Sequence, residues 1–425
     1  MADDTEVTQP PSHARSTPPN GQPTSPYNHH HNSHHHHHQQ HHPHTQNSAP
    51  SPPPSAAANY GAQEATFVRP SDLLRPKAVP RNIPPPAPPK ADRPIDRDER
   101  AGLQAIRDFL RARKCYDVLP LSFRLIELDV GLTVKESLQI MVQCGIVSAP
   151  LWDSNTSTYA GLLTVNDYLN VVRYYNVHAD KLKDVDKLLL SDLKDLEKVL
   201  NVKPPETVSA SPEAILYDAL RKQLVSRARR IPLVSYDSDT QRTMVTSVIT
   251  QYRILKFISM NVKETDMLRK PLEMIKLGTY TGIVRCSMDT TVLDVVDEMV
   301  TKNISSVPVV TTEGMLLNVF EAVDVIEILK SGDYGNLTWT VGKALSCRSP
   351  NHPGIYCCSL EDGLDTIFET IKKSRVHRLM VVDEQNYLKG VLSLSDILHY
   401  LLVDGSEEKD GAGHGHLSAE KIYGA

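Results

Sequence analysis

The turns TVND (164–167), TQYR (250–253), EAVD (321–324) and SLSD (393–396) each follow an apolar strand pattern and open a helical one. Three of these turns end in Asp and one ends in Arg. They recur about every 70 to 90 residues, and a pattern with such a fixed period indicates an internal repeat. The repeat therefore predicts the architecture before any single residue is considered.

Each turn lies near the end of the same order of elements. An amphipathic helix pattern comes first, then a short strand, a polar turn, a second strand, and the helix that opens at the Asp or Arg. A unit of about 50 residues buries too little surface to be stable alone, so pairing of the small sheets is expected. First helices are predicted at 133–145, 211–227, 290–303 and 360–375, first strands at 147–152, 229–234, 305–310 and 377–382, and one further strand before each unit at 123–129, 207–210, 282–286 and 355–359.

Three local signals refine this pattern. Pro150, Pro232 and Pro308 stand inside first strands, which predicts an edge or an irregular point there. Ser211 followed by proline predicts the N-cap of the helix at 211–227. The charged, amphipathic segment 181–200 is interpreted as a solvated connector.

The N-terminal part has a different composition. Residues 1 to about 95 contain 20 of the 30 prolines and 12 of the 18 histidines, with few large apolar side chains. Such a segment cannot offset its ordering entropy by burial, so it is predicted to be disordered. The histidine run from His29 to His44 could bind a divalent metal, but few carboxylates accompany it, and we interpret it as low-complexity sequence and assign no metal.

Composition and motifs exclude several classes of protein. The net charge of -5 gives no reason to expect a nucleic-acid partner. The sequence has no apolar run long enough for a transmembrane helix and no secretion-signal core. The six cysteines fit neither a zinc site nor a disulfide framework, which indicates reduced thiols in an intracellular protein. Because no P-loop, kinase signature or nucleophile–base pair is present, an enzyme is not expected.

The segments YRILKF (252–257), LGTY (277–280), VHRL (376–379) and KGVLSLSDIL (389–398), in this order, resemble the cystathionine-beta-synthase (CBS) repeat. Four such units resemble the gamma regulatory subunits of the AMP-activated and sucrose-non-fermenting protein kinases, of the fungal type. The resemblance implies an α/β fold of four CBS repeats, arranged as two tandem pairs in a flat disk. The expected domains are a disordered tail at 1–97, CBS repeats at 98–180, 201–262, 273–335 and 345–405, and a flexible tail at 406–425.

The same resemblance implies a function. The chain would be a non-catalytic regulatory subunit that binds AMP, ADP or ATP in clefts between the repeats. Its partners would be a kinase catalytic alpha subunit and a beta scaffold subunit, in the cytoplasm and nucleus, with no nucleic acid or membrane partner. Two alternatives stay open: a CBS-repeat scaffold without nucleotide sensing, and an enzyme with attached CBS repeats, which the small remaining length disfavours.

The terminal aspartates of the turns are the first candidate binding residues. A carboxylate can accept hydrogen bonds from both hydroxyls of a ribose, although Asp near a helix start can also be an ordinary cap. Three aspartates at equivalent places favour ribose binding. Arg253 cannot accept a hydroxyl donor, so the second repeat is predicted to be empty.

The fourth repeat carries the most complete set of candidates. Its serines and Asp396 suit a sugar, and its cations suit a phosphate. The resemblance places Val147 where mammalian relatives carry an arginine, Tyr252 where they carry a lysine, and an acid, Glu321, in the hydroxyl position of the third turn. These departures predict weaker first and third sites. The predicted nucleotide-binding residues, some of them assigned by the resemblance alone, are Thr164, Asp167, Arg229, Arg230, Thr279, Val284, Ile304, Ser305, Asp324, Arg348, His377, Arg378, Ser393, Ser395 and Asp396.

Overall fold

A computed structural model of the protein describes residues 67–68, 93–120, 124–202, 208–226, 228–239, 242–330, 334–349 and 352–403. All of them belong to one compact unit, Asn59–Ala425. The histidine run and the C-terminal tail lie outside these ranges, and so does most of the N-terminal tail. Two described pieces fall within the tail predicted to be disordered, namely β1 (Phe67–Val68) and the start of α1 (Pro94–Arg111). Ordered structure therefore begins before the predicted boundary at residue 98.

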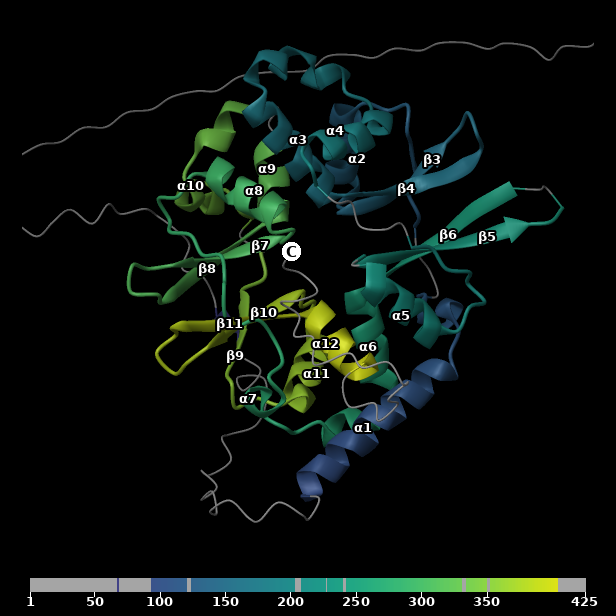
Figure 1. Ribbon diagram of the computed structural model, residues 1–425, viewed down its shortest axis with the longest axis vertical. Helices are drawn as coiled ribbons and strands as arrows, with labels where there is room; N and C mark the ends of the chain where they lie inside the picture. Colours follow the sequence, from purple (N-terminus) through teal and green to yellow (C-terminus); the bar gives the residue numbers. More distant parts are fainter. Residues whose placement is uncertain are drawn as a thin grey trace, which may run out of the picture. The chain divides into compact units, whose positions relative to one another are not determined.

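Four units repeat the order helix, strand, strand, helix (Figure 1). In each unit the two strands form an antiparallel hairpin that leads directly into the last helix. This confirms the predicted α/β repeat. The units are α2 (Val134–Cys144), β3 (Ser148–Asp153), β4 (Thr158–Thr164) and α3 (Val165–Val177); α5 (Leu216–Ser226), β5 (Arg230–Asp237), β6 (Arg242–Thr250) and α6 (Gln251–Asn261); α8 (Val292–Thr301), β7 (Ser306–Val310), β8 (Leu316–Glu321) and α9 (Ala322–Leu329); α11 (Leu364–Lys373), β10 (Arg378–Val382), β11 (Leu388–Ser393) and α12 (Leu394–Leu402).

The further strand predicted before each unit is regular only in the first and fourth. β2 (Leu128–Asp129) lies parallel to β3, and β9 (Ile355–Cys358) lies between β10 and β1, parallel to both. In the second and third repeats this strand is reduced to single bridges, from Ala210 to β5 and from Cys286 to β7. The connecting helices are η2 (Cys115–Val118), η3 (Ala179–Lys187), η4 (Leu190–Asp192), α4 (Leu193–Val199), η5 (Lys263–Met267), α7 (Leu272–Ile275), η6 (Tyr334–Thr338) and α10 (Val341–Ser346).

The strand prolines behave largely as predicted. Pro232 and Pro308 lie in two-stranded sheets whose other side carries only a single bridge, and an irregularity in the ladder follows each of them within two residues. Pro150 lies in the middle strand of three, but the pairing of that strand with β2 begins only at Leu151. The missing amide proton is therefore not required by a ladder bond.

The predicted N-cap at Ser211 is wrong. The helix begins five residues later, at Leu216. The intervening backbone pairs with the segment after α1: the Cys115 N–H donates to the carbonyl of Ala214 at 2.9 Å, and the Leu216 N–H donates to that of Arg113 at 2.8 Å. This tertiary pairing holds the serine–proline pair in a turn and overrides the local helix signal.

Two large hydrophobic cores link the repeats crosswise. Helices of the first and third repeats share one core, in which α3 packs on α8 and α9. Those of the second and fourth share the other, in which α6 packs on α11 and α12. The hairpins link repeats that are consecutive in sequence: β4 contacts β6, and Met315 at the turn before β8 bridges Tyr387 at the turn before β11.

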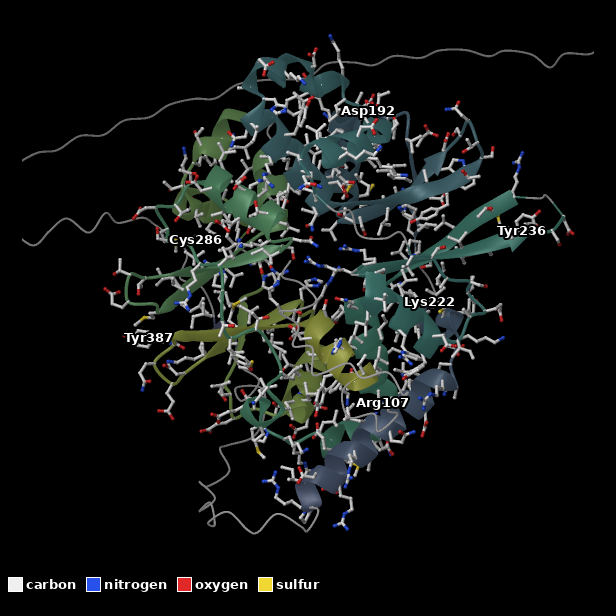
Figure 2. The ribbon with its side chains drawn as sticks, in the orientation of Figure 1. Arg107, Asp192, Lys222, Tyr236, Cys286 and Tyr387 are labelled. Carbon is white, nitrogen blue, oxygen red and sulfur yellow. The ribbon has the colours of Figure 1, made fainter. Side chains whose placement is uncertain are left out.

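Helix α1 is fixed to the second core by polar contacts. Arg107 (Figure 2), which is buried, donates from Nε to the carbonyl of Leu401 at 2.7 Å. The hydroxyl of Tyr400 donates to Oε1 of buried Glu99 at 2.7 Å. None of the helices in the described ranges combines the length and apolar character needed to cross a bilayer.

Candidate functional site

The last residue of each turn lies at the start of a helix and takes part in its cap. In SLSD, Oδ2 of Asp396 accepts the N–H of Ser393 at 2.8 Å and its hydroxyl at 2.6 Å. The same backbone bond forms in TVND, at 2.5 Å, and in EAVD, at 2.6 Å. In TQYR the direction is reversed, and Oγ1 of Thr250 accepts the N–H of Arg253 at 3.2 Å. Capping therefore uses Oδ2 of each aspartate, and Oδ1 is the oxygen left for another donor.

In the third repeat, Arg348 takes both oxygens of Asp324. Its Nε donates to Oδ1 at 2.7 Å and its Nη2 to Oδ2 at 2.6 Å. Nη1 donates to Oδ1 of Asn318 at 3.0 Å, and Nη2 also donates to the carbonyl of Val319 at 2.6 Å. The two charged side chains are only 10% and 4% exposed. Arg348, which was predicted to contact a phosphate, is instead committed to the carboxylate that was predicted to hold a ribose.

In the first repeat, Asp167 meets a second carboxyl group, that of Glu197 on α4. The two carboxyl groups hydrogen bond to each other, and Nδ2 of Asn170 donates to Glu197 Oε1 at 3.3 Å. Burial raises the pKa of both acids, and the nearby Asp167 adds to the rise for Glu197, whose pKa reaches about 7. The pair therefore shares a proton. The prediction of a solvated connector at 181–200 is wrong for α4, because one face of this helix is buried, Glu197 included.

In the fourth repeat, Asp396 keeps an open acceptor. Burial raises its pKa, and the hydrogen bonds from Ser393 act in the opposite direction. Among the described residues, no donor reaches Oδ1. Ser395 donates to Oε1 of Gln251 on α6 at 3.1 Å and is therefore committed to a neighbouring helix rather than to an open face.

Thr279 is placed against the fourth repeat by two backbone hydrogen bonds with Val391 of β11, at 2.8 and 2.9 Å. Gly278 precedes it with a φ of 116°, a conformation that favours glycine. The ring of Tyr280 lies so close to Gly390 that an added Cβ would be 2.5 Å from it. The LGTY and KGVLSLSD motifs therefore fit each other, as expected for two sides of one cleft. The other predicted third-repeat contacts, Val284 and Ile304, are half-buried and pack against the core of the first and third repeats.

Cations of the second and fourth repeats meet at Ser305 of the third. Its hydroxyl oxygen accepts hydrogen bonds from Nη1 of Arg229 and, at 3.2 Å, from Nη2 of Arg378. The other terminal nitrogen of Arg378, Nη1, lies 3.5 Å from Oε1 of Glu321. This nitrogen is buried and makes no hydrogen bond within the described part of the chain. A buried donor in that position suits an additional acceptor.

Further cationic and titratable groups gather around His377, the neighbour of Arg378. Burial, together with Arg375, Arg378 and Arg230, lowers the pKa of His377 to about 4. Burial and Arg375 also lower the pKa of Arg230, to about 10. Tyr252 lies beside His377, with 6.1 Å between the ring centres. Positive groups that lower one another's pKa in this way indicate that an anion would be stabilised among them.

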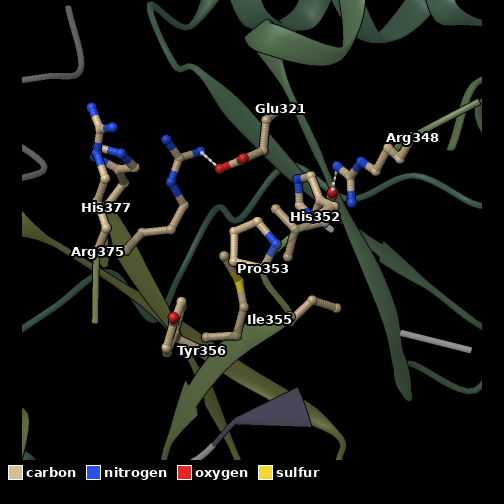
Figure 3. A pocket seen from close by; sticks show the side chains of 12 residues that line it. Glu321, Arg348, His352, Pro353, Ile355, Tyr356, Arg375 and His377 are labelled. Carbon is tan, nitrogen blue, oxygen red and sulfur yellow. Dashed lines mark hydrogen bonds and ion pairs between the residues drawn. The ribbon is translucent and has the colours of Figure 1, made fainter. Parts of the chain in front are cut away.

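A pocket opens on this cluster (Figure 3). Arg375 and His377 lie on one side, Arg348 lies on the other, and Glu321 lies between them above an apolar floor. Pro353, Ile355 and Tyr356 contribute to that floor. Sequence reasoning missed Arg375 and Glu197. Arg375 ends a predicted helix two residues before His377, and Glu197 is an acid on an apolar helical face, so each carried a detectable signal.

The described residues include no group of three or more His, Cys, Asp or Glu side chains that could hold a metal ion. The site is therefore built from guanidinium groups, hydroxyls and single carboxylates. Such a donor set suits an organic anion that carries hydroxyls.

Comparisons with known proteins agree with the repeat. The family model described as CBS domain matches residues 278–331 and 351–403. A 5'-AMP-activated protein kinase subunit gamma of Kluyveromyces lactis is 47% identical over 315 residues, which cover 74% of this chain and 96% of that protein. The subunit of the same name from Saccharomyces cerevisiae is 47% identical over 306 residues, covering 72% and 95%.

The chain is also similar to a solved structure from Methanocaldococcus jannaschii, described as a putative archaeal homolog of g-AMPK. That likeness has a TM-score of 0.53 at 15% identity and covers 68% of this chain and 99% of the other. At this level of identity the likeness concerns the fold alone.

Proposed function

Because the chain belongs to the family of the gamma subunits of the 5'-AMP-activated protein kinase, we propose that it is a regulatory subunit that senses adenine nucleotides. AMP, ADP or ATP would bind between the third and fourth repeats. The complex would contain a catalytic alpha subunit and a beta scaffold subunit, act in the cytoplasm and nucleus, and respond to energy or glucose supply. The gamma subunit would contribute binding and no catalysis.

One arrangement in the fourth repeat carries the nucleotide proposal. Arg378 and Ser393 are cross-strand partners in the β10–β11 hairpin, and Ser393 is bonded to Asp396. Ser393 therefore connects Asp396, whose Oδ1 is open, to Arg378, whose buried Nη1 makes no hydrogen bond within the described residues. A ribose hydroxyl suits the first group and a phosphate suits the second. Thr279 and Ser305 border this arrangement from the third repeat.

The other turns lack such an arrangement. Asp324 is taken by Arg348 and Asp167 by Glu197, while the second turn ends in Arg253. The proposal therefore favours one well-bound nucleotide per chain.

Titration calorimetry on the full chain with AMP, ADP and ATP tests the proposal. Asp396→Asn keeps an acceptor for the cap but removes the charge from the ribose-facing oxygen. Loss of a charge-assisted hydrogen bond costs about 1.5–3 kcal/mol, so the affinity should fall by roughly 10- to 150-fold. The matched control is Asp294→Asn, because Asp294 accepts the hydroxyl of Thr291, as Asp396 accepts that of Ser393, at the exposed start of α8.

Two results would contradict the proposal. If none of the three nucleotides binds the unaltered chain, the alternative of a CBS-repeat scaffold without nucleotide sensing is favoured. If Asp396→Asn and Asp294→Asn bind equally well, the ribose is not held at Asp396. Co-purification with alpha and beta subunits, and imaging of a fluorescent fusion, test the proposed partners and location separately.

A further inference from the structure

Arg348 differs from the other cations of the site in being fully engaged by the protein itself. It follows α10 and lies outside the helix–strand–strand–helix unit whose carboxylate it contacts. All three of its side-chain nitrogens donate, two of them to Asp324 and one to Asn318, and Nη2 donates to a backbone carbonyl as well. A guanidinium held by four hydrogen bonds in a buried place is a structural element rather than a solvated charge.

The position of Asp324 in its repeat is the same as that of Asp396. Both are the fourth residue of the turn, both accept the N–H of the first residue, and both lie at the start of a helix after a hairpin. The difference lies in Oδ1, which accepts Arg348 Nε in the third repeat and no described donor in the fourth. The third turn therefore has the geometry of the binding position in the fourth repeat, but Arg348 of the same chain already occupies it.

A ribose would have to replace a bidentate ion pair with two neutral donors. The exchange is unfavourable, because it leaves a buried guanidinium and a buried carboxylate without each other. The pocket of Figure 3 has Arg348 on its wall, opposite Arg375 and His377. A ligand that reaches this pocket therefore meets several cations, while its one lining carboxylate, that of Glu321, lies 3.5 Å from Nη1 of Arg378.

On the basis of the proposed function, we propose that Arg348 is a built-in competitor that closes the third repeat to nucleoside phosphates. The repeat retains its binding position, and the guanidinium occupies the place of the sugar hydroxyls. Removal of the guanidinium should expose a second site that uses Asp324.

The test is the stoichiometry of AMP and ATP binding to the full chain, measured by calorimetry. In Arg348→Gln the molar ratio should rise from about one to about two. Arg348→Lys keeps Asp324 neutralised and so protects the fold, but an ammonium cannot form the bidentate pair. This variant should show a second, weaker binding event. The control is Arg173→Gln, which removes an ion pair of comparable length (2.8 Å to Asp297) away from the pocket and should leave the ratio unchanged.

A further variant separates this inference from the proposed function. Arg348→Gln combined with Asp396→Asn should retain binding at the third repeat alone, and adding Asp324→Asn should abolish that binding. If Arg348→Gln and Arg348→Lys both keep a ratio of one while the fourth repeat still binds, the competitor role is wrong. Loss of nucleotide binding in Arg348→Gln would likewise overturn it, because Arg348 would then be a ligand contact. Absence of binding to the unaltered chain would instead refute the proposed function.

Discussion

Replacing Glu197 with Gln should change how the stability of the protein depends on pH. Glu197 is 8% exposed and lies against Asp167, with Asn170 donating to its Oε1. A glutamine can still accept from Asn170 and can donate an N–H to Asp167. It cannot ionise, so the pair no longer needs a shared proton.

The sign follows from proton binding. Burial and Asp167 raise the pKa of Glu197 from 4.5 to about 7 in the folded chain. Between these values the folded state binds the proton and the unfolded state does not, so stability falls as the pH rises through this window. A shift of about 2.5 units corresponds to roughly 3 kcal/mol. Lys194 lies near the pair and lowers this pKa, so the shift is already the net effect. We expect Glu197→Gln to stabilise the chain by up to about 3 kcal/mol at pH 8.

Urea unfolding of the full chain at pH 5 and pH 8 measures this effect. At pH 8 the variant should be more stable than the original chain, and at pH 5 the two should nearly coincide. Glu136→Gln is the control with the opposite sign, because hydrogen bonds from Thr133 lower the pKa of Glu136. Its contribution is lost only as the pH falls below the unfolded pKa of 4.5, so Glu136→Gln should lose nearly the same stability at pH 5 and at pH 8. Equal gains for Glu197→Gln at both pH values, or a loss at pH 8, would refute the shared proton.

Two further substitutions test the packing of the cleft and the empty second turn. Gly390→Ala places a Cβ 2.5 Å from the ring of Tyr280 and should destabilise the chain by about 1–3 kcal/mol; urea unfolding that shows no change would mean that the two motifs are not in contact. Arg253→Asp supplies a carboxylate to a turn in which Thr250 already accepts the backbone N–H of residue 253, and calorimetry should detect additional nucleotide binding. An unchanged molar ratio would remove the support for the charge argument at that turn.

The repeat itself could be predicted from the sequence because its signals are local. Apolar periodicity gave the helices and strands, and the hydroxyl–x–x–acid turns gave the helix starts, since a cap connects residues three apart. The N-cap at Ser211 could not be excluded locally, because the backbone of 212–216 is held by residues near Cys115. The same applies to β1, which is ordered by pairing with a strand almost 300 residues away.

The side chains that contact the turn aspartates could not be predicted from the sequence, for a similar reason. It identified Asp167, Asp324 and Asp396 as equivalent, and a common motif gives no information on what each carboxylate contacts. Arg348 is 24 residues from Asp324, and Glu197 is 30 residues from Asp167. The prediction that the first and third sites are weaker was drawn from Val147 and Glu321. The structure shows stronger obstacles to nucleotide binding, because Arg348 contacts Asp324 in the third repeat and Glu197 contacts Asp167 in the first.

The charge distribution of the site links ligand binding to the packing of the repeats. Arg229 and Arg378 reach Ser305 from the second and fourth repeats, and Arg230 and Arg375 depress the pKa of His377. The fold therefore holds several cations together at an electrostatic cost. A bound phosphate would offset that cost only while the repeats remain assembled, and so would stabilise the folded chain in proportion to its affinity. A partner subunit that contacts two or more repeats could then respond to the nucleotide without contacting it, provided that it binds the liganded arrangement more tightly.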